Sequence, residues 1–114
     1  MGGRFGLAGR LNRGAVRLCR FERPGKQRPV LILTRDGAVG HLSTVTVAPI
    51  TSTVRDVPSE VVLDVEDGMK ARCTVNLHNA VTISQDRLGK QIASLSNLRM
   101  QQICAALRFS LGCE

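Results

Sequence analysis

The sequence predicts a mainly β protein of the α+β class: a small, strongly bent antiparallel sheet or barrel followed by one C-terminal helix. The chain of 114 residues is long enough for one domain with its own core. Up to about residue 95, short segments rich in β-branched residues alternate with turn-forming Gly, Pro, Asp and Asn. From residue 96 onward, apolar residues instead recur at helical spacing. Short strands followed by a single helix are typical of this fold class.

The first half of the chain is expected to contain three strands. The segment 15–20 alternates apolar and polar residues, which places Arg17 on its solvent-exposed face. A continuous apolar run at 29–34 indicates a buried strand, and a Pro-Gly pair separates these two strands. A third strand at 42–50 is expected to be the longest, and a polar turn at 51–56 follows it.

Shorter strands and the helix are expected in the second half. The strand segments are 59–65, 72–83, which is broken into two pieces near Asn79, and 91–95, which follows a turn at 86–90. Ser96 is a good N-cap for a helix that runs to about Leu111, and Gly112 is a natural residue just past its end. One face of this helix is apolar and is expected to face the core; it comprises Met100, Ile103, Cys104, Leu107 and Leu111.

Positive charge is concentrated in the first third of the chain. Residues 1–35 contain nine Lys or Arg and one acidic residue, whereas residues 36–114 contain seven basic and eight acidic residues. Such a one-sided block favours a polyanionic partner such as a nucleic acid. With three Phe and no Trp or Tyr, the protein has few aromatic rings on which bases could stack. A bound nucleic acid would therefore be held mostly by charge, hydrogen bonds and shape.

The first thirteen residues are rich in Gly and Arg and show no periodicity. We expect 1–13 to form a flexible basic arm ahead of a domain at 14–114, with an inert leader as the alternative. The arm lacks the apolar core of a signal peptide, and no apolar run is long enough to span a membrane. A cytoplasmic protein with reduced cysteines is therefore expected. No two of the four cysteines form a C-x-x-C pair, so no metal site is expected.

Polar side chains stand at two strand ends, where a small sheet protein exposes its functional groups. Pro29 lacks an N–H group and belongs at a strand start, which places Arg28 where an apolar strand leaves a basic loop. Thr51 lies where the longest strand runs out into a polar turn. A guanidinium and a hydroxyl together would suit a phosphate. The alternatives are a solvated Arg on an edge strand and a Thr that only forms the turn.

These segments resemble the MazF/PemK (Kid) family of toxin endoribonucleases. The resemblance covers roughly residues 14–113 and rests on Gly-Lys-Gln-Arg-Pro-Val at 25–30, Val-Ala-Pro-Ile-Thr at 47–51 and a later strand at 73–83. It implies an SH3-like barrel with a C-terminal helix, in a homodimer whose RNA groove runs along the dimer interface. It also implies an acidic cognate antitoxin that lies in this groove, to which the basic first third would be attracted.

The resemblance gives Arg28 and Thr51 their expected roles. Arg28 matches the family's catalytic Arg, and because arginine stays protonated it would stabilise the negative charge that develops on the phosphate. Thr51 matches the family's catalytic Thr or Ser and would orient the scissile phosphate. The nucleophile would be the RNA's own 2′-OH, which leaves a 2′,3′-cyclic phosphate and a 5′-OH without a metal or other cofactor.

A third catalytic residue is expected at His78. Kid-like members carry Arg-x-Asp on the matching strand, which aligns here with Asn76-Leu77-His78. Asn76 and His78 would share a strand face, because side chains alternate along a strand. Histidine ordinarily titrates near pH 6.5, which suits a general base. A structural or surface His is the alternative.

Further positions are expected to contact single-stranded RNA, namely Arg17, Lys26, Gln27, Ser52 and Asn76. Two alternatives to the endoribonuclease remain open. One is a catalytically inactive SH3-like RNA-binding module. The other is a gyrase-directed toxin like CcdB, which depends on a C-terminal Trp, whereas this chain has no Trp.

Overall fold

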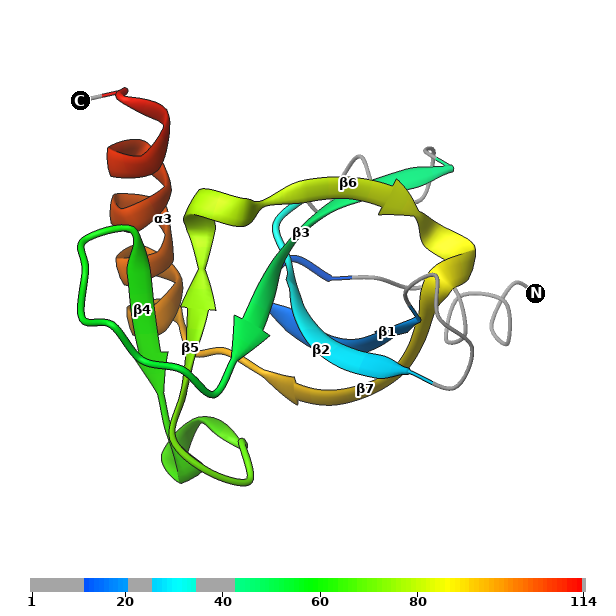
Figure 1. Cartoon of the computed structure of the whole chain (residues 1–114). Helices are drawn as coiled ribbons and strands as arrows, with labels where there is room; N and C mark the ends of the chain where they lie inside the picture. Colours follow the sequence, from blue (N-terminus) through cyan, green and yellow to red (C-terminus); the bar gives the residue numbers. More distant parts are fainter. Residues whose placement is uncertain (1–11, 21–25, 35–42, 114) are drawn as a thin grey trace.

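A computed structural model describes residues 12–20, 26–34 and 43–113, which form seven strands and one α-helix (Figure 1). The strands are β1 (Ala15–Arg20), β2 (Gln27–Ile32), β3 (Thr44–Thr51), β4 (Glu60–Leu63), β5 (Cys73–Asn76), β6 (Val81–Ser84) and β7 (Leu88–Ser94). The helix is α3 (Asn97–Leu111), and three short 3-10 turns join the later strands: η1 (Val65–Asp67), η2 (Leu77–Asn79) and η3 (Gln85–Arg87). Within these ranges, no helix has the length and apolar character needed to cross a membrane.

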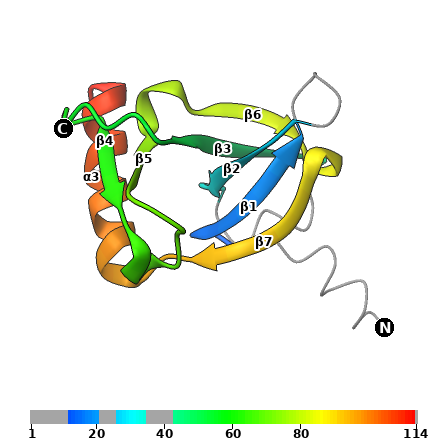
Figure 2. The ribbon, with the colours of Figure 1, turned by 60° about the horizontal axis from the view of Figure 1, so that its bottom comes forward.

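All strand pairs are antiparallel. They follow the order β4-β5-β3-β2-β1-β7, and β6 also pairs with β3. The sheet bends strongly, so that β1 and β7 curve round opposite β3 and β6 (Figures 1 and 2). The predicted bent antiparallel sheet with a C-terminal helix is confirmed. Among the described strands, however, β4 and β7 at the two ends do not pair with each other, so the sheet stays open.

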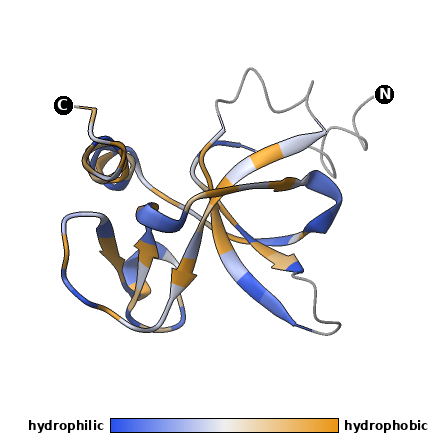
Figure 3. Ribbon diagram, turned by 45° about the horizontal axis from the view of Figure 1, so that its top comes forward, coloured by the Kyte–Doolittle hydropathy of each residue, from blue (hydrophilic) through white to orange (hydrophobic). Residues whose placement is uncertain are grey.

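Two buried clusters lie on either side of β2 and β3. The helix-side core joins Leu31 of β2 and Ile50 of β3 to Ile103 of α3. The second core contains Val30 and Val47 from the same two strands. Because side chains alternate along a strand, β2 and β3 are buried on both faces where they pair with each other. Figure 3 shows the apolar residues along the strands of the sheet. This two-sided burial makes β2 and β3 the centre of the fold.

The helix has the predicted ends. Ser96 caps it by accepting a hydrogen bond from the backbone N–H of Arg99 (3.2 Å). Gly112 ends it in the left-handed region with a φ of 73°, which glycine adopts without strain. Ile103 is fully buried as predicted, but Leu111 is exposed because the last turn extends past the sheet (Figure 1). The prediction that Leu111 faces the core is therefore wrong.

Strand boundaries differ from the prediction where short turns intervene. Strand β4 is shorter than the predicted 59–65, because Asp64 begins η1 by accepting a hydrogen bond from the N–H of Glu66 (3.0 Å). The break predicted near Asn79 is confirmed as η2. Strand β7 is longer than the predicted 91–95, because the turn before it consists only of η3.

Most of the predicted arm, residues 1–11, lies outside the described residues. Arg13, at the expected end of the arm, contacts the domain instead. Its guanidinium donates hydrogen bonds to the Leu33 carbonyl (2.6 Å) and to the sulfur of Cys104 (3.1 Å). The domain therefore begins no later than Arg13. All four cysteines are free thiols.

Candidate active site

The register of β2 and β3 relates Arg28 to Thr51. Val30 of β2 pairs with Pro49 of β3, and the two strands run antiparallel. The pairing ends at Val30 and Pro49, and Arg28 and Thr51 each lie two residues beyond it along their own strand. Val30 and Pro49 share a face because they are directly opposite, and side chains alternate along a strand. The register therefore puts Arg28 and Thr51 on the same face of the sheet, just beyond the end of the pairing.

A row of polar side chains continues this face onto β5 and β4. Thr51 pairs with Thr74 of β5, and β5 in turn pairs Asn76 with Glu60 of β4. Residues two apart on a strand share a face, so Asn76 lies on the same face as Thr74. We call this set the polar face; it comprises Arg28, Thr51, Thr74, Asn76 and Glu60.

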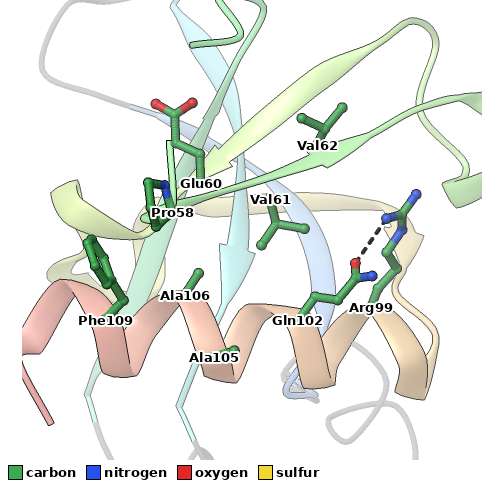
Figure 4. Close-up of a pocket in the computed structure, with 9 residues that line it drawn as sticks. All are labelled: Pro58, Glu60, Val61, Val62, Arg99, Gln102, Ala105, Ala106 and Phe109. Atoms are coloured by element: carbon green, nitrogen blue, oxygen red, sulfur yellow. Dashed lines mark hydrogen bonds between the residues drawn. The ribbon is translucent and has the colours of Figure 1, made fainter. Parts of the chain in front are cut away.

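The polar face is the side of the sheet that α3 leaves uncovered. The intervening residues Ile50, Val61 and Val75 point the other way, into the helix-side core. Figure 4 shows this for β4, where Val61 points toward α3 while Glu60 and Val62 point away from it. A hollow of about 490 Å³ lies between β4 and α3, and none of the residues that line it lies on β2 or β3.

Two members of the polar face are already used by the fold. Thr74 is fully buried, and its hydroxyl donates a hydrogen bond to the Val61 carbonyl (3.2 Å). Asn76 is also buried, and its side-chain oxygen accepts a hydrogen bond from the backbone N–H of His78 (3.0 Å). Hydrogen bonds within the fold thus hold both side chains in place beside Thr51.

The other side of the row is available to a ligand. Arg28 is exposed at the start of β2, and Thr51 is half-buried at the end of β3. The Thr51 hydroxyl donates a long hydrogen bond to the Thr53 carbonyl (3.3 Å), which an incoming acceptor can replace. A guanidinium and a hydroxyl donate charge-assisted hydrogen bonds to phosphate oxygens. The pair is thus suited to an anionic phosphate.

His78 does not lie on the strand where it was predicted. Strand β5 ends at Asn76, and His78 lies within the 3-10 turn η2. The Asn76 side chain caps this turn, and such local side-chain bonds compete with the hydrogen bonds of a strand ladder. The prediction that Asn76 and His78 share a strand face is therefore wrong. His78 is exposed, so its imidazole remains accessible to a ligand.

Three of the predicted RNA contacts flank the pair of Arg28 and Thr51. Lys26 and Gln27 are exposed immediately before Arg28, and Ser52 is exposed immediately after Thr51. Their exposure follows from their positions outside the doubly buried stretch of β2 and β3. They extend the candidate site along both strand ends.

Arg17 does not lie on a solvent-exposed face, and that prediction is wrong. It is half-buried, and its Nε donates a hydrogen bond to the Gly89 carbonyl of β7 (2.6 Å). Burial lowers the pKa of its guanidinium. The register of β1 with β7 shifts on both sides of Arg17, and the side chain joins the two strands there. Because this hydrogen bond holds the Arg17 side chain against β7, the alternation of the sequence overestimated its exposure.

Thr74 and an ion pair between Arg55 and Glu60 were not predicted from the sequence. Glu60 is a carboxylate at the start of a strand that is otherwise apolar, and such a residue needs a partner when it is enclosed. That signal could have drawn attention to a nearby cation. Across the described residues, no three His, Cys, Asp or Glu side chains gather as a metal site would require.

A family model matches most of this chain. It describes the PemK-like, MazF-like toxins of type II toxin–antitoxin systems, and it matches residues 12–111. This chain belongs to that family. The match spans all seven strands and α3, and it confirms the resemblance that the sequence segments indicated.

Relatives in Mycobacterium tuberculosis carry endoribonuclease names. The chain is 38% identical over 103 residues to the probable endoribonuclease MazF5, and the aligned region covers 90% of this chain and 94% of that protein. It is 49% identical over 70 residues to the endoribonuclease MazF3, and the aligned region covers 61% of this chain and 68% of that protein.

Solved structures share the fold. The Mycobacterium tuberculosis toxin MazF-mt6 matches with a TM-score of 0.81 and 35% identity, over 88% of this chain and 98% of that one. An endoribonuclease from Mycobacterial species, solved in complex with its cognate antitoxin, matches with a TM-score of 0.81 and 27% identity. That match covers 91% of this chain and 97% of the other.

Proposed function

We propose that this toxin is an endoribonuclease that cuts single-stranded RNA at a short recognition sequence, and that an acidic cognate antitoxin neutralises it. The observation that carries the proposal is the register of β2 and β3, which puts the exposed Arg28 and the half-buried Thr51 on the same face of the sheet. Relatives named as endoribonucleases support the activity. A relative solved with its cognate antitoxin supports the inhibitor.

The proposed reaction is an attack within the RNA itself. The 2′-OH of one nucleotide attacks the adjacent phosphorus and gives up its proton to a base. The bond to the 5′ oxygen of the next nucleotide breaks, and that oxygen takes up a proton. A 2′,3′-cyclic phosphate and a 5′-OH result, with no metal or other cofactor. Arg28 stabilises the charge that builds on the non-bridging oxygens, and Thr51 donates to one of them and orients the phosphate.

His78 is the proposed proton acceptor. It is exposed directly after β5, whereas the neighbouring Asn76 is an amide that cannot take up a proton at neutral pH. Because η2 carries His78 off the strand, the RNA must extend past Asn76 to reach it. The flanking residues Lys26, Gln27 and Ser52 are proposed to bind neighbouring phosphates, whereas Arg17 is held by β7.

The functional unit is proposed to be a cytoplasmic homodimer. In the family, the RNA groove runs along the dimer interface, so the groove would combine surfaces of two copies. An acidic antitoxin segment in the same groove would compete with RNA for the same cations. Residues 1–11 add Arg4 and Arg10, which are proposed to make diffuse contacts with phosphates outside the groove.

The test is to incubate the purified protein with a long RNA, with and without EDTA, and to map the new ends. We expect 5′-OH ends at a recurring short sequence, equally in both conditions. The Arg28→Ala protein, purified in the same way, is the control for a contaminating nuclease. Binding of RNA without cleavage would indicate the inactive RNA-binding module. Cell killing without RNA binding or cleavage would contradict the proposal and indicate another target, such as gyrase.

A further inference from the structure

An ion pair that the proposed chemistry does not use lies on the polar face. Glu60 accepts three hydrogen bonds from Arg55: from its backbone N–H (3.3 Å), from Nε (3.0 Å) and from Nη2 (2.7 Å). The Glu60 side chain is 1% exposed, whereas that of Arg55 is 60% exposed. The protein therefore encloses the carboxylate and presents the guanidinium to solvent.

The loop between β3 and β4 holds Arg55 in this position. The next residue, Asp56, has a φ of 58°, in the left-handed region, which Asp and Asn adopt more readily than most residues other than glycine. The N–H of Glu60 donates to the Val57 carbonyl (3.0 Å), which closes the loop onto β4. The placement of Arg55 is thus specified by its side-chain bonds and by the loop backbone.

The ion pair lies close to the proposed catalytic residues. Glu60 pairs with Asn76, and Thr51 pairs with Thr74 two residues earlier on the same strand. From a strand spacing of about 4.8 Å and a rise of about 3.3 Å per residue, the Cα atoms of Glu60 and Thr51 are roughly 12 Å apart. A few nucleotides of a single strand can span such a distance.

The free side of the guanidinium is suited to an anion. Arginine has five N–H donors, of which Nε and one N–H of Nη2 are used by Glu60. Within the described ranges, Nη1 of Arg55 meets no acceptor. We propose that Arg55, held by Glu60, binds a phosphate that flanks the scissile phosphate. The identity of the ligand as RNA rests on the proposed function, but the phosphate-binding role of Arg55 can be tested separately.

Neutralising the enclosed Glu60 carboxylate uses only one side of the Arg55 guanidinium. The exposed side of the guanidinium adds little to stability. A guanidinium that is already held in place, by contrast, loses less side-chain freedom when a phosphate binds. The pair therefore leaves the exposed side of Arg55 preorganised for a ligand.

The test uses a labelled, mixed-sequence single strand that contains only 2′-deoxyribose, because a strand without the attacking hydroxyl cannot be cleaved. Its affinity is measured as a function of salt concentration. We expect Arg55→Ala to weaken binding roughly tenfold at low salt, the usual size of one lost charge-assisted hydrogen bond. The slope of log affinity against log salt should fall by about 0.7, the contribution of one phosphate contact on a single strand.

The decisive variant is Arg55→Ala combined with Glu60→Gln. It keeps the net charge of +7 and leaves no enclosed carboxylate without a partner. The proposal expects it to bind as weakly as Arg55→Ala, with the same reduced slope. The matched control is Arg108→Ala, which removes one exposed cation from the last turn of α3 and should leave the slope unchanged. Melting temperatures of all four proteins, measured beside the binding, identify any variant that is not folded.

Three outcomes separate this proposal from the proposed function. A double variant that binds with the wild-type affinity and slope would overturn the role of Arg55, even if the wild type cleaves RNA. A loss in the double variant supports the role, even if the wild type binds strands without cleaving RNA. A wild type that neither binds the strand nor cleaves RNA would overturn both proposals.

Discussion

Each face of the β4–β5–β3 part of the sheet has an ion pair between an arginine and a carboxylate, and the two pairs differ in how exposed the arginine is. On the helix side, Arg99 of α3 donates two hydrogen bonds to Asp67 of η1, at 2.9 and 3.1 Å, and both side chains are largely shielded. On the polar face, Glu60 is shielded but its partner Arg55 is exposed. The covered face thus satisfies its charges internally, whereas the open face leaves a cation for a ligand.

The Asp67 pair illustrates what a structural clamp requires. Burial alone would raise the pKa of Asp67, but hydrogen bonds from Arg99 and from the Asp64 backbone, together with the charge of Arg99, lower it overall. The same contact raises the pKa of Arg99. Asp67 also completes a capping box with Asp64 in η1. The clamp therefore ties the turn between β4 and β5 to the start of α3. Changes on this side should cost stability, and changes on the polar face should cost activity.

The largest expected effect lies on the open face. Arg28→Ala and Thr51→Ala should each lower RNA cleavage by at least roughly a hundredfold, as the loss of one transition-state donor typically does. Arg28→Lys should not restore the full rate, because a point charge lacks the bidentate fork. Single-turnover cleavage and thermal melting check this together. Near-wild-type cleavage by Arg28→Ala, or a large fall in its melting temperature, would break the comparison.

The proton transfer at His78 provides the second prediction. If His78 accepts the 2′-OH proton, cleavage should become faster as the pH rises, because only the neutral imidazole can take up a proton. His78→Ala should remove this rise and slow cleavage roughly a hundredfold. The matched control is His41→Ala, the chain's other histidine, which lies outside the described residues. A pH–rate profile of His78→Ala that keeps both the rise and the wild-type rate would return His78 to a surface role.

A substitution in the helix-side core should have the opposite signature. Ile103 is fully buried between α3 and the sheet, so Ile103→Ala leaves a cavity and should cost about 3 kcal/mol of unfolding free energy. The cleavage rate per folded molecule should not change. Denaturant unfolding and an active-fraction measurement test the two halves of this statement. A loss of specific activity without a loss of stability would show that the faces are not independent.

Breaking the clamp should cost less, and the cost should depend on pH. Arg99→Ala should lower stability at pH 7 by about 2 kcal/mol, the scale of a lost hydrogen bond to a charged group. Because the pKa of Asp67 is lowered in the folded protein, its contribution is complete above its usual value of 3.8. That contribution is lost as the pH falls through the lowered value. The stability difference between wild type and Arg99→Ala should therefore shrink in acid. A difference that stays constant down to pH 2 would exclude the carboxylate as its source.

The smallest effect is expected from the basic residues at the start of the chain. Deleting residues 1–11 removes Arg4 and Arg10 but keeps Arg13, which contacts the domain. The deletion should leave the melting temperature unchanged and weaken strand binding mainly at low salt. The salt slope should fall by roughly one, as expected for two diffuse cations. An identical slope before and after deletion would mean that the arm is inert.

Local signals in the sequence predicted the helix and its ends. Ser96 and Gly112 are placed by capping chemistry that acts within one turn. Pro29 was expected at a strand start, but β2 begins two residues earlier at Gln27, so Arg28 lies within the strand and pairs with Cys19.

The bend from β5 into η2 also has a local cause, because the Asn76 side chain accepts a hydrogen bond from the backbone N–H of His78. The alternation of apolar and polar residues gives no sign of this bond. An alternating pattern therefore predicts a strand correctly only where no side chain bonds to the nearby backbone and turns the chain.

Relations across strands could not be read from the sequence. The pairing of Thr51 with Thr74, and the pairing of Glu60 with Asn76 that puts Arg55 near them, depend on register, which tertiary packing sets. Arg17 was misplaced for the same reason, since its partner is a carbonyl on the last strand. Positions that local chemistry fixes were therefore predictable, and contacts that depend on a residue of another strand were not.

We propose that Arg28 at the start of β2 and Thr51 at the end of β3 act on one phosphate. A double-mutant cycle on single-turnover RNA cleavage tests it most directly, because it compares Arg28→Ala, Thr51→Ala and the double variant. Residues that act as a unit are strongly non-additive. The double variant should cleave about as slowly as the slower single variant. A double variant slowed by the full product of the two single effects would contradict it.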